Sequence, residues 1–273
     1  MTSAHGSPSG ANWYDAGATA TFAVTSPDTS GTTQYVFTVW SGDSSASTAS
    51  ATKTMDAAHA VTANWQTQYN VSYATTGNVV SVAAPSDEWV NSGGVATGVF
   101  PVQVTIGGSR SNFASDDRPL TITAPTTVTG TYSNQYQLTV TSAHGITSGA
   151  GWYPAGSMAY AGLSTGTVSG GAGIQYVFTG WSSDASGISF SSSNAITMNA
   201  PKTATANWNT QYQVTFAVSG SGSTNPSGSN VWANASFLFI TASPNAGYTF
   251  SYWSSKLGQL PLVMLILLLL PQQ

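Results

Sequence analysis

The stretch Thr205-Ala206-Asn207-Trp208-Asn209-Thr210-Gln211-Tyr212 decides the fold, because it recurs along the chain. Residues 62–69 repeat it almost unchanged, and residues 129–136 are a degraded copy with Tyr132 in the place of the tryptophan. Repetition of this kind is typical of a tandem array of small structural units. We call each copy a seam, and we expect it to end one module and begin the next.

Residues on both sides of the seam alternate with a period of two. Alanine and tryptophan alternate with threonine and asparagine over residues 203–208, and apolar residues alternate with polar or small ones over residues 212–218. This period predicts β-strands with one buried face. Between the two runs, Asn209-Thr210-Gln211 is a polar link too short for a flexible tether, so we expect neighbouring modules to sit end to end.

The composition indicates a folded chain with an uncharged polar surface. Only 5% of the 273 residues are charged, the net charge is −4, and there is no cysteine. The 5 Lys and Arg residues are too few for the basic patch that nucleic-acid binding requires, so we exclude nucleic acid as a partner. The 9 Trp, 12 Tyr and 10 Phe residues are too many for a chain without packed cores. No helical pattern is apparent.

Two landmarks with aromatic residues align four modules. The first is a tryptophan followed by turn residues, at residues 13–17, 89–93, 152–156 and 232–236. The second is a strand that closes on an aromatic residue, at residues 35–40, 176–181 and 248–253. In the second module we expect Ile106 in this place. A buried aromatic side chain removes a large area from water, so these residues are the expected cores.

A third landmark is an apolar residue ten positions before the seam aromatic, at Met55, Ile122 and Met198. Its constant spacing predicts a fixed hairpin. Together the landmarks predict a first module without its opening strand, a divergent second module, a third module, a truncated fourth module and an aberrant apolar tail, over residues 1–66, 67–133, 134–209, 210–255 and 256–273. Because residues 2–6 repeat residues 141–145, the chain is expected to be a fragment of a longer array.

The tail departs from the repeat pattern. The nine apolar residues between Pro261 and Pro271 would span about 14 Å as a helix, against about 30 Å for the hydrocarbon core of a membrane. Membrane contact is therefore expected only if residues 260–271 belong to the true protein sequence. We favour a frameshift in the coding sequence, because plausible codons read in another frame restore a composition rich in serine and threonine.

The modules together carry a recognisable family pattern. Its first half is clearest in the fourth module, in residues 212–216, 220–222, 225–228, 240–250 and Trp253. Its second half lies in the first and third modules, in residues 40–43 and 181–184, in Met55 and Met198, and in residues 61–65 and 204–208. These stretches resemble the divergent internalin B-type repeat, or bacterial repeat domain, of bacterial and archaeal surface proteins. The second module departs most, at Tyr132 and Ile106.

The resemblance implies small β-rich modules along extracellular stalks and adhesins, without enzymatic activity. Together with the alternating residues, it predicts an all-β tandem array of small β-sandwich or β-grasp-like repeat modules. We expect an extracellular or cell-surface segment that acts in spacing, adhesion or envelope structure. Its expected partners are neighbouring repeats and cell-envelope glycans or proteins.

The histidines do not predict a catalytic site. His5 and His144 recur in Ser-Ala-His-Gly, whereas His59 lies in an unrelated link. No acid and no nucleophile recurs with them at a constant spacing, so a Ser-His-Asp site is not expected. We expect turns in which the imidazole caps backbone groups.

No metal or cofactor site is predicted either. The only candidate calcium ligands are Asp116-Asp117, Asp87-Glu88, Asp43 and Asp184, and none shows the dense alternation of oxygen ligands in a calcium loop. Asp43 and Asp184 are expected to close the turn after the tryptophan, and Asp116-Asp117-Arg118 to form a surface turn with a local ion pair. Glycine clusters such as residues 220–222 lack the lysine and helix of a phosphate loop.

A carbohydrate-binding module that uses exposed tryptophan and tyrosine is the alternative function. Trp13-Tyr14 and Trp152-Tyr153 are the candidate stacking pairs, although we favour core packing for both tryptophans. The alternative requires both indoles to be exposed and coplanar with their tyrosines. Asn70-Val71-Ser72 and Asn234-Ala235-Ser236 are glycosylation sequons, which matter only in an exported protein.

Overall fold

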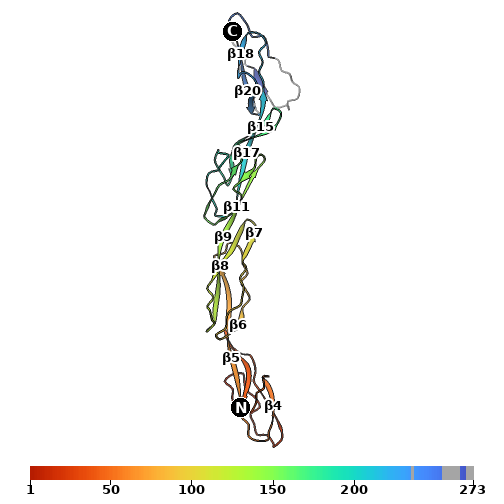
Figure 1. Cartoon of the computed structure of the whole chain (residues 1–273), viewed down its shortest axis with the longest axis vertical. Helices are drawn as coiled ribbons and strands as arrows, with labels where there is room; N and C mark the ends of the chain where they lie inside the picture. The colour runs from red at the N-terminus through yellow and green to blue at the C-terminus, as the bar shows by residue number, and fades with distance from the viewer. Residues whose placement is uncertain (235–236, 254–264, 269–273) are drawn as a thin grey trace. The chain divides into compact units, whose positions relative to one another are not determined.

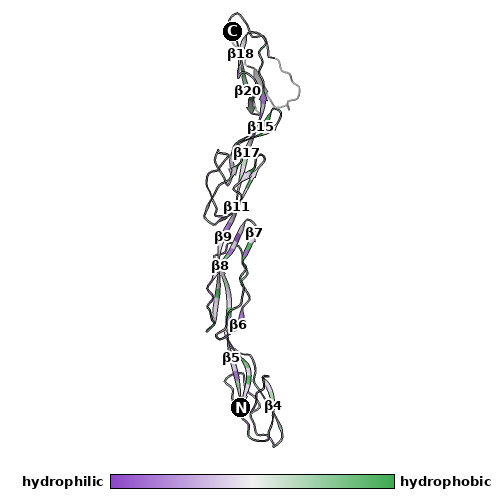
Figure 2. Cartoon of the chain, viewed as in Figure 1, coloured by the Kyte–Doolittle hydropathy of each residue, from purple (hydrophilic) through white to green (hydrophobic). Residues whose placement is uncertain are grey.

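The computed structural model describes residues 1–234, 237–253 and 265–268 (Figure 1). All the helices and strands assigned within these residues are strands, with no helix among them, which confirms the predicted all-β class. The chain divides into two compact units, residues 1–134 and residues 135–273. Figure 2 shows that apolar and polar residues are interspersed along the strands, as the period-two alternation predicts.

The first unit is built mainly from antiparallel strands. Its strands are β1 (Thr19–Ala23), β2 (Asp28–Ser30), β3 (Thr33–Gly42), β4 (Ser50–Thr54), β5 (Val61–Thr76), β6 (Glu88–Asn91), β7 (Gln103–Ile106) and β8 (Ser109–Asp116), with the first part of β9 (Thr126–Ser142). β1 pairs with β4 in a separate small sheet, while β2, β3 and β5 follow one another in the large sheet.

The second unit repeats this arrangement. It contains the rest of β9, and then β10 (Thr147–Ser148), β11 (Gly151–Pro154), β12 (Met158–Ala159), β13 (Gly162–Leu163), β14 (Thr167–Gly171), β15 (Ile174–Ser183), β16 (Ile196–Thr197), β17 (Lys202–Val214), β18 (Gly222–Asn225), β19 (Val231–Asn234), β20 (Phe237–Pro244) and β21 (Leu265–Leu268). β14, β15, β17 and β9 are neighbours in that order, and the small β12–β16 sheet corresponds to β1–β4.

The seams at residues 62–69 and 205–212 lie inside single long strands. β5 pairs antiparallel with β3, then antiparallel with β6, and its last residues pair parallel with β9. β17 pairs antiparallel with β15 and then with β19, and its first residues pair parallel with β9. The predicted polar link at residues 209–211 is therefore wrong, because all three residues pair with β15 as part of β17. One strand serves both sides of the seam.

A register shift places the core tryptophans. β3 shifts register between Phe37 and Val39, and β15 shifts between Phe178 and Gly180. One extra residue lets Trp40 face the same side as Phe37, three positions before it, with ring centroids 5.3 Å apart. Trp40 is 1% exposed and Trp181 is 6% exposed, which confirms these two predicted core residues.

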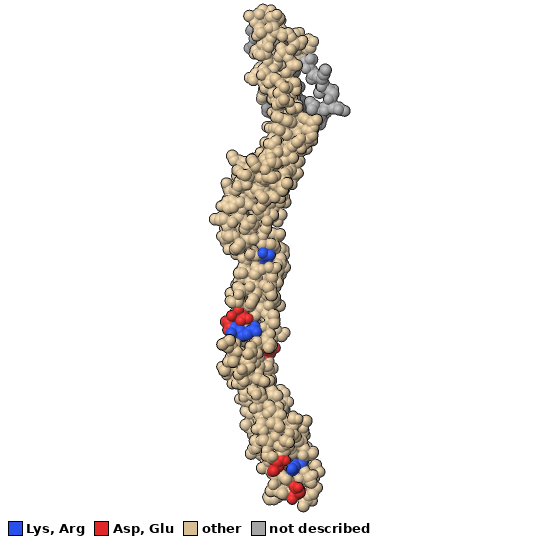
Figure 3. Space-filling model, viewed as in Figure 1, with Lys and Arg blue, Asp and Glu red and all other residues tan. Residues whose placement is uncertain are grey.

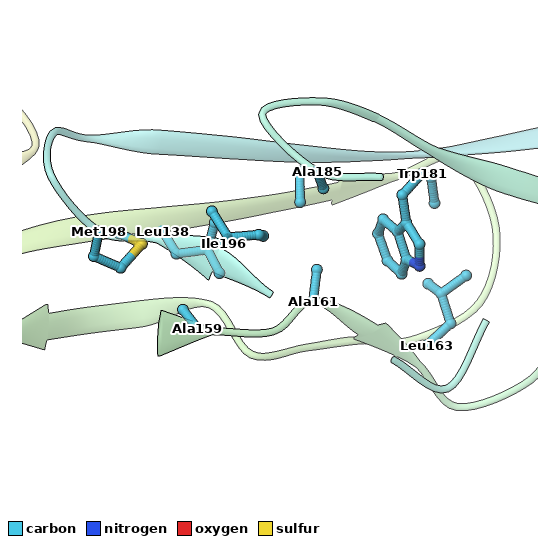
Figure 4. Packing of buried hydrophobic residues seen from close by; sticks show 10 residues of the cluster. Leu138, Ala159, Ala161, Leu163, Trp181, Ala185, Ile196 and Met198 are labelled. Atoms are coloured by element: carbon cyan, nitrogen blue, oxygen red, sulfur yellow. The ribbon is translucent and has the colours of Figure 1, made fainter. Parts of the chain in front are cut away.

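The core of the third module shows how small and large residues fit together. Trp181 packs beside Ala161 and Leu163, while Leu138, Ile196 and Met198 fill the other end of the same cluster (Figure 4). The indole nitrogen of Trp181 donates to the backbone oxygen of Ser189 at 2.9 Å, as the indole of Trp40 does to Thr48 at 3.0 Å. Each buried indole therefore has a polar partner.

The third landmark does not form the predicted hairpin with its seam strand. The residues before Met55 and Met198, in β4 and β16, pair instead with β1 and β12. Met198 exchanges two backbone hydrogen bonds with the turn after the first landmark, through the amide of Gly156 and the carbonyl of Ser157. Met55 and Ile122 make the same pair of bonds at Gly17–Ala18 and Gly93–Gly94. The constant spacing between these residues and the seam aromatic therefore goes with a hydrogen-bonded contact to the turn of the first landmark. That turn lies far earlier in the sequence.

The second module uses different residues for its core. Phe113 packs edge-on against Tyr132 with centroids 5.8 Å apart, as Phe37 does against Trp65 and Phe178 against Trp208 at 5.9 Å. Phe113 thus corresponds to Phe37 and Phe178, and not to the closing aromatic residue for which Ile106 was expected. Ile106 is 57% exposed, because it lies at the end of the β7–β8 hairpin beside its turn.

The fourth module differs most from its prediction. Residues 248–253 form no strand, although Phe250 and Trp253 lie 5.3 Å apart, as the corresponding rings do in the first and third modules. β21 pairs parallel with residues 237–240 of β20. The rest of the predicted apolar tail, including Pro261 and Pro271, lies outside the described residues.

Candidate functional site

The recurring histidines belong to a cluster that appears once in each unit. The ring of His5 stacks on Tyr35 at 3.5 Å and meets the edge of Trp65 at 5.8 Å. His144 stacks on Tyr176 at 3.6 Å and meets Trp208 at 5.5 Å. The cluster fixes the segment that opens each module against the sheet.

The imidazole does not cap the turn as predicted. The serine two positions earlier does so, because Ser3 donates its hydroxyl to the carbonyl of His5, and Ser142 does the same to His144. The seam tryptophan donates its indole hydrogen to the same serine, at 3.1 Å from Trp65 to Ser3. The imidazole ring instead stacks with its face on the tyrosine ring, and this contact holds the turn in place.

Among the residues that the structure describes, an acid accompanies only one of these two histidines. Oδ2 of Asp28 lies 3.7 Å from Nδ1 of His5 and accepts the amide of Gly6 at 2.9 Å. Asp28 stands opposite Tyr35 in the sheet, and Val168 stands in the same place opposite Tyr176. Ser3, His5 and Asp28 do not form a catalytic triad, because the hydroxyl hydrogen of Ser3 points to a backbone carbonyl and not to the imidazole.

Asp43 and Asp184 bind the strand that leads into the seam. Asp43 accepts the amide of Ala60 at 2.6 Å, and Asp184 accepts the amide of Thr203 at 2.8 Å. These backbone hydrogen bonds are the main reason that the pKa of each carboxyl lies below its ordinary value. The two residues therefore tie the end of the tryptophan strand to the start of the seam strand, beyond the local turn that was predicted.

A basic side chain lies beside each of these aspartates, and its identity differs. Lys202 places Nζ 3.3 Å from Oδ1 of Asp184. The corresponding residue of the first module is His59, whose Nδ1 lies 3.5 Å from Oδ2 of Asp43 and whose Nε2 lies 2.7 Å from Oδ1 of Asp56. His59, predicted to lie in an unrelated link, is thus the counterpart of Lys202.

The second module carries a polar clamp that the sequence did not reveal. Arg118 donates from Nη1 to the carbonyl of Ala96 at 2.8 Å and from Nη2 to the carbonyl of Gly98 at 2.6 Å, and it pairs with Asp116 at 3.2 Å. The predicted local ion pair between Asp116 and Arg118 is confirmed, but Arg118 also reaches beyond its own turn. The guanidinium is partly buried and fixes a separate loop.

Glu88 holds the other side of this loop. It accepts the hydroxyl of Thr97 and the amides of Thr97 and Gly98 at 2.6, 2.6 and 3.2 Å, and it also accepts the hydroxyl of Tyr73. Burial raises the pKa of Glu88, but these hydrogen bonds outweigh it and lower the pKa to about 2. Burial and the carboxylate of Glu88 raise the pKa of Tyr73.

The candidate calcium ligands are distributed over separate structural roles. Asp116 pairs with Arg118, and Asp117 accepts the amide of Thr129 at 2.6 Å. Glu88 already accepts the hydrogen bonds from Thr97, Gly98 and Tyr73 described above. Among the residues that the structure describes, no group of three or more acids and histidines could hold a metal ion.

The two candidate stacking pairs differ in exposure. Trp13 is 97% exposed, so its predicted core packing is wrong, whereas Trp152 is half-buried on β11 opposite Gln137. Trp89 and Trp232 also lie opposite a residue of the strand that opens their module, Asn70 and Gln213.

In both candidate stacking pairs, the tyrosine hydroxyl is already bound to the backbone. Tyr14 donates its hydroxyl to the carbonyl of Gly10 at 2.9 Å, and Tyr153 donates to Gly149 at 2.7 Å. Both rings are half-buried. Of the sequon asparagines, Asn70 is half-buried within β5, and the exposed Asn234 accepts a hydrogen bond from Gln211 at 3.0 Å.

Side-chain amides join the strands at two seams. Gln34 donates to Gln68 at 2.6 Å, and Gln68 donates to Asn91 at 2.8 Å. In the second unit the same series runs from Gln175 to Gln211 to Asn234, at 2.7 and 3.0 Å. We call each series an amide ladder. The glutamine before each seam tyrosine, at positions 68, 135 and 211, was the sequence signal that could have revealed it.

The remaining surface is mostly uncharged. Figure 3 shows the acidic and basic side chains in a few small groups on an otherwise uncharged face. Along the parallel strands, pairs of hydroxyl groups bind each other where charged pairs could stand. These pairs are Thr2 with Thr62 at 2.8 Å, Ser72 with Thr127 at 2.7 Å and Thr141 with Thr205 at 3.1 Å. Within the described part of the chain, no helix is long and apolar enough to span a membrane.

Comparison with known families agrees with the recurring geometry. The model of the divergent InlB B-repeat domain matches residues 1–69, 136–211 and 212–263. The matched segments leave out residues 70–135, where Tyr132 and the Arg118 clamp replace features of the other modules. A search of curated proteins and a search of solved structures find no match. The chain belongs to the divergent InlB B-repeat family.

Proposed function

We propose that this chain is a non-enzymatic structural segment of an extracellular or cell-surface protein, which spaces or supports other parts of that protein. The observation that carries the proposal is the continuity of β5 and β17 through their seams. A shared strand leaves no free backbone between two modules to bend. Modules joined in this way transmit position and force along the chain.

The amide ladders support the same function. In each ladder, the central glutamine accepts a hydrogen bond from the module before the seam and donates one to the module after it. Twisting at the seam would break these bonds, which contribute about 1 kcal/mol each. The family, whose repeats occur in surface proteins, agrees with this role.

Distance measurement across a seam tests the spacer function. The chain has no cysteine, so Thr54→Cys and Thr105→Cys, both at exposed positions, give two unique sites for spin labels in the first unit. We expect a narrow distribution of distances between the labels. A matched variant with Gly-Ser-Gly-Ser inserted between Gln66 and Thr67 should broaden it. Equal widths in the two proteins would contradict a rigid spacer.

The surface location needs its own test. We expect an antibody raised against residues 134–209 to label intact cells of the native host, or its culture medium, without permeabilisation. Labelling that appears only after permeabilisation would contradict the proposed location, while leaving the distance result unaffected.

The exposed Trp13 favours sugar stacking as a second candidate function. A single open indole can stack on a pyranose ring, and its partner Tyr14 lies next to it in sequence. Binding of soluble cell-wall oligosaccharides, measured by calorimetry, should then disappear in Trp13→Ala and persist in Trp152→Ala. Absence of binding in the native chain, or equal binding in Trp13→Ala, would reject this candidate.

A further inference from the structure

His59 lies between two carboxylates that belong to different segments. Oδ2 of Asp43, which follows the tryptophan of β3, lies 3.5 Å from Nδ1, and Oδ1 of Asp56, which follows β4, lies 2.7 Å from Nε2. The side chain of His59 is only 14% exposed, and its Nδ1 is buried without a hydrogen bond among the described residues. Lys53 on β4 is the other charged group that acts on both carboxylates.

A neutral imidazole cannot satisfy this arrangement. It carries one N–H donor and one acceptor nitrogen, whereas the imidazolium carries two donors. A neutral His59 that donates to Asp56 must turn the lone pair of Nδ1 toward the carboxylate of Asp43, which is unfavourable. A protonated His59 donates in both directions and joins the two segments.

We propose that Asp43, His59 and Asp56 form a proton-sensitive clasp that holds the entry to the first seam more tightly in mildly acidic surroundings than above neutral pH. The clasp acts on backbone that matters for the seam, because Asp43 also accepts the amide of Ala60 and donates its own amide to the carbonyl of Ala60. Val61, the next residue, begins β5.

The sign follows from the groups involved. A histidine between two carboxylates donates to both only while it is protonated, so its contribution to holding them falls as the pH rises. The amide of Ala60 lowers the pKa of Asp43, and the hydrogen bond from His59 lowers that of Asp56, both below the ordinary value of 3.8. Both acids therefore stay ionised above about pH 4, so a loss of the clasp at higher pH is not due to their titration.

The third module supplies a matched control within the same chain. Lys202 stands in the place of His59, and Asn199 stands in the place of Asp56. Lysine keeps its charge through the whole range in which histidine titrates. Thr203, whose amide binds Asp184 as that of Ala60 binds Asp43, reports on a clasp that should not respond between pH 5.5 and 7.5.

Amide hydrogen exchange of the full chain at pH 5.5 and 7.5, corrected for the intrinsic rate, tests the proposal. We expect the protection of Ala60 to fall about two- to five-fold at the higher pH, the range expected for partly exposed ion pairs. Thr203 should not change. His59→Lys should abolish the response and keep Ala60 protected at both pH values. His59→Gln should give the low protection at both.

A transfer experiment separates the clasp from a merely structural role of His59. Lys202→His combined with Asn199→Asp should give Thr203 the pH response of Ala60. The proposal is overturned if native Ala60 shows no response, if His59→Lys retains it, or if the transferred pair gives Thr203 none. These outcomes do not depend on the spacer function, which the label distances test separately.

Discussion

The second and third modules close the same loop by different means. In the third module, Met158 and Ala159 pair with Thr197 and Ile196 as short strands. The corresponding residues of the second module, 95–96 and 120–121, form no strand. There, Arg118 donates to the carbonyls of Ala96 and Gly98. A side chain has taken over hydrogen bonds that backbone amides make elsewhere.

Proline explains why the second module needs this substitution. Pro119 directly precedes residues 120–121 and stands in the place of Thr52, which pairs with Thr21 in the first module, and proline has no amide hydrogen to donate. The planar guanidinium offers several donors in a fixed fork, which suits two carbonyls of one loop. A repeat can therefore lose a strand pair and keep its frame, provided that a fixed charge binds the released carbonyls.

Removal of the buried indole should have the largest effect and should strike only the third module. Trp181→Ala leaves a cavity among Ala161, Leu163 and Ala185, and it should cost about 3–5 kcal/mol of local stability. Peptide-resolved hydrogen exchange would show faster opening of residues 155–165, while residues 90–100 stay protected. Trp13→Ala, at a 97% exposed site, is the control and should change stability by less than about 0.5 kcal/mol. Equal destabilisation of both modules would show that they do not have separate cores.

Arg118→Ala should have the next largest effect and should strike only the second module. It leaves the carbonyls of Ala96 and Gly98 without their donors, at a cost of about 2–3 kcal/mol. Arg118→Lys should recover only part of this, because a single ammonium cannot fork between two carbonyls. Lys202→Ala in the third module, at an exposed ion pair, should cost less than about 1 kcal/mol. A full rescue by lysine would mean that charge alone matters.

The strands and most of the core could be predicted from the sequence. The alternation around Trp208 and Tyr212 identified β17, and the recurrence of the landmarks identified Trp40 and Trp181 as buried. These features are local, because a period of two directly reports which face a residue occupies. The family resemblance came from the same recurring residues.

The partners of each strand could not be predicted in the same way. The bulge after Phe37 adds one residue to the register, and a simple alternation cannot show where that happens. The spacing of Met198 from Trp208 measured a distance along the chain and not a contact, so its partner Gly156 was missed. Arg118 was read as a surface residue because its target, the loop at residues 96–98, lies about twenty positions earlier.

Acid should loosen the second module before the third. The pKa of Glu88 is about 2, below its ordinary value of 4.5, so its stabilisation is complete above about pH 4.5 and is lost as the pH falls toward 2. Hydrogen exchange at Thr97 and Gly98 should therefore accelerate over this range relative to the intrinsic rate. Gly151 takes the place of Glu88 in the third module, so residues 157–163 should not show this loss. Glu88→Gln should lower protection at neutral pH and remove the acid dependence, and a variant that still responds to acid would contradict this assignment.

The amide ladders should give the smallest effect, and they sharpen the comparison because they flank both modules. Gln68→Ala removes the bonds to Gln34 and Asn91, and Gln211→Ala removes those to Gln175 and Asn234. Each variant should cost about 1–2 kcal/mol, since two neutral hydrogen bonds of about 1 kcal/mol are lost at a partly exposed site. A double-mutant cycle between Gln175→Ala and Gln211→Ala should give a coupling of about 0.5–1 kcal/mol in urea unfolding of the second unit. Additive losses would mean that the amides bind water as well as they bind each other, and that the continuous strand alone holds the seam.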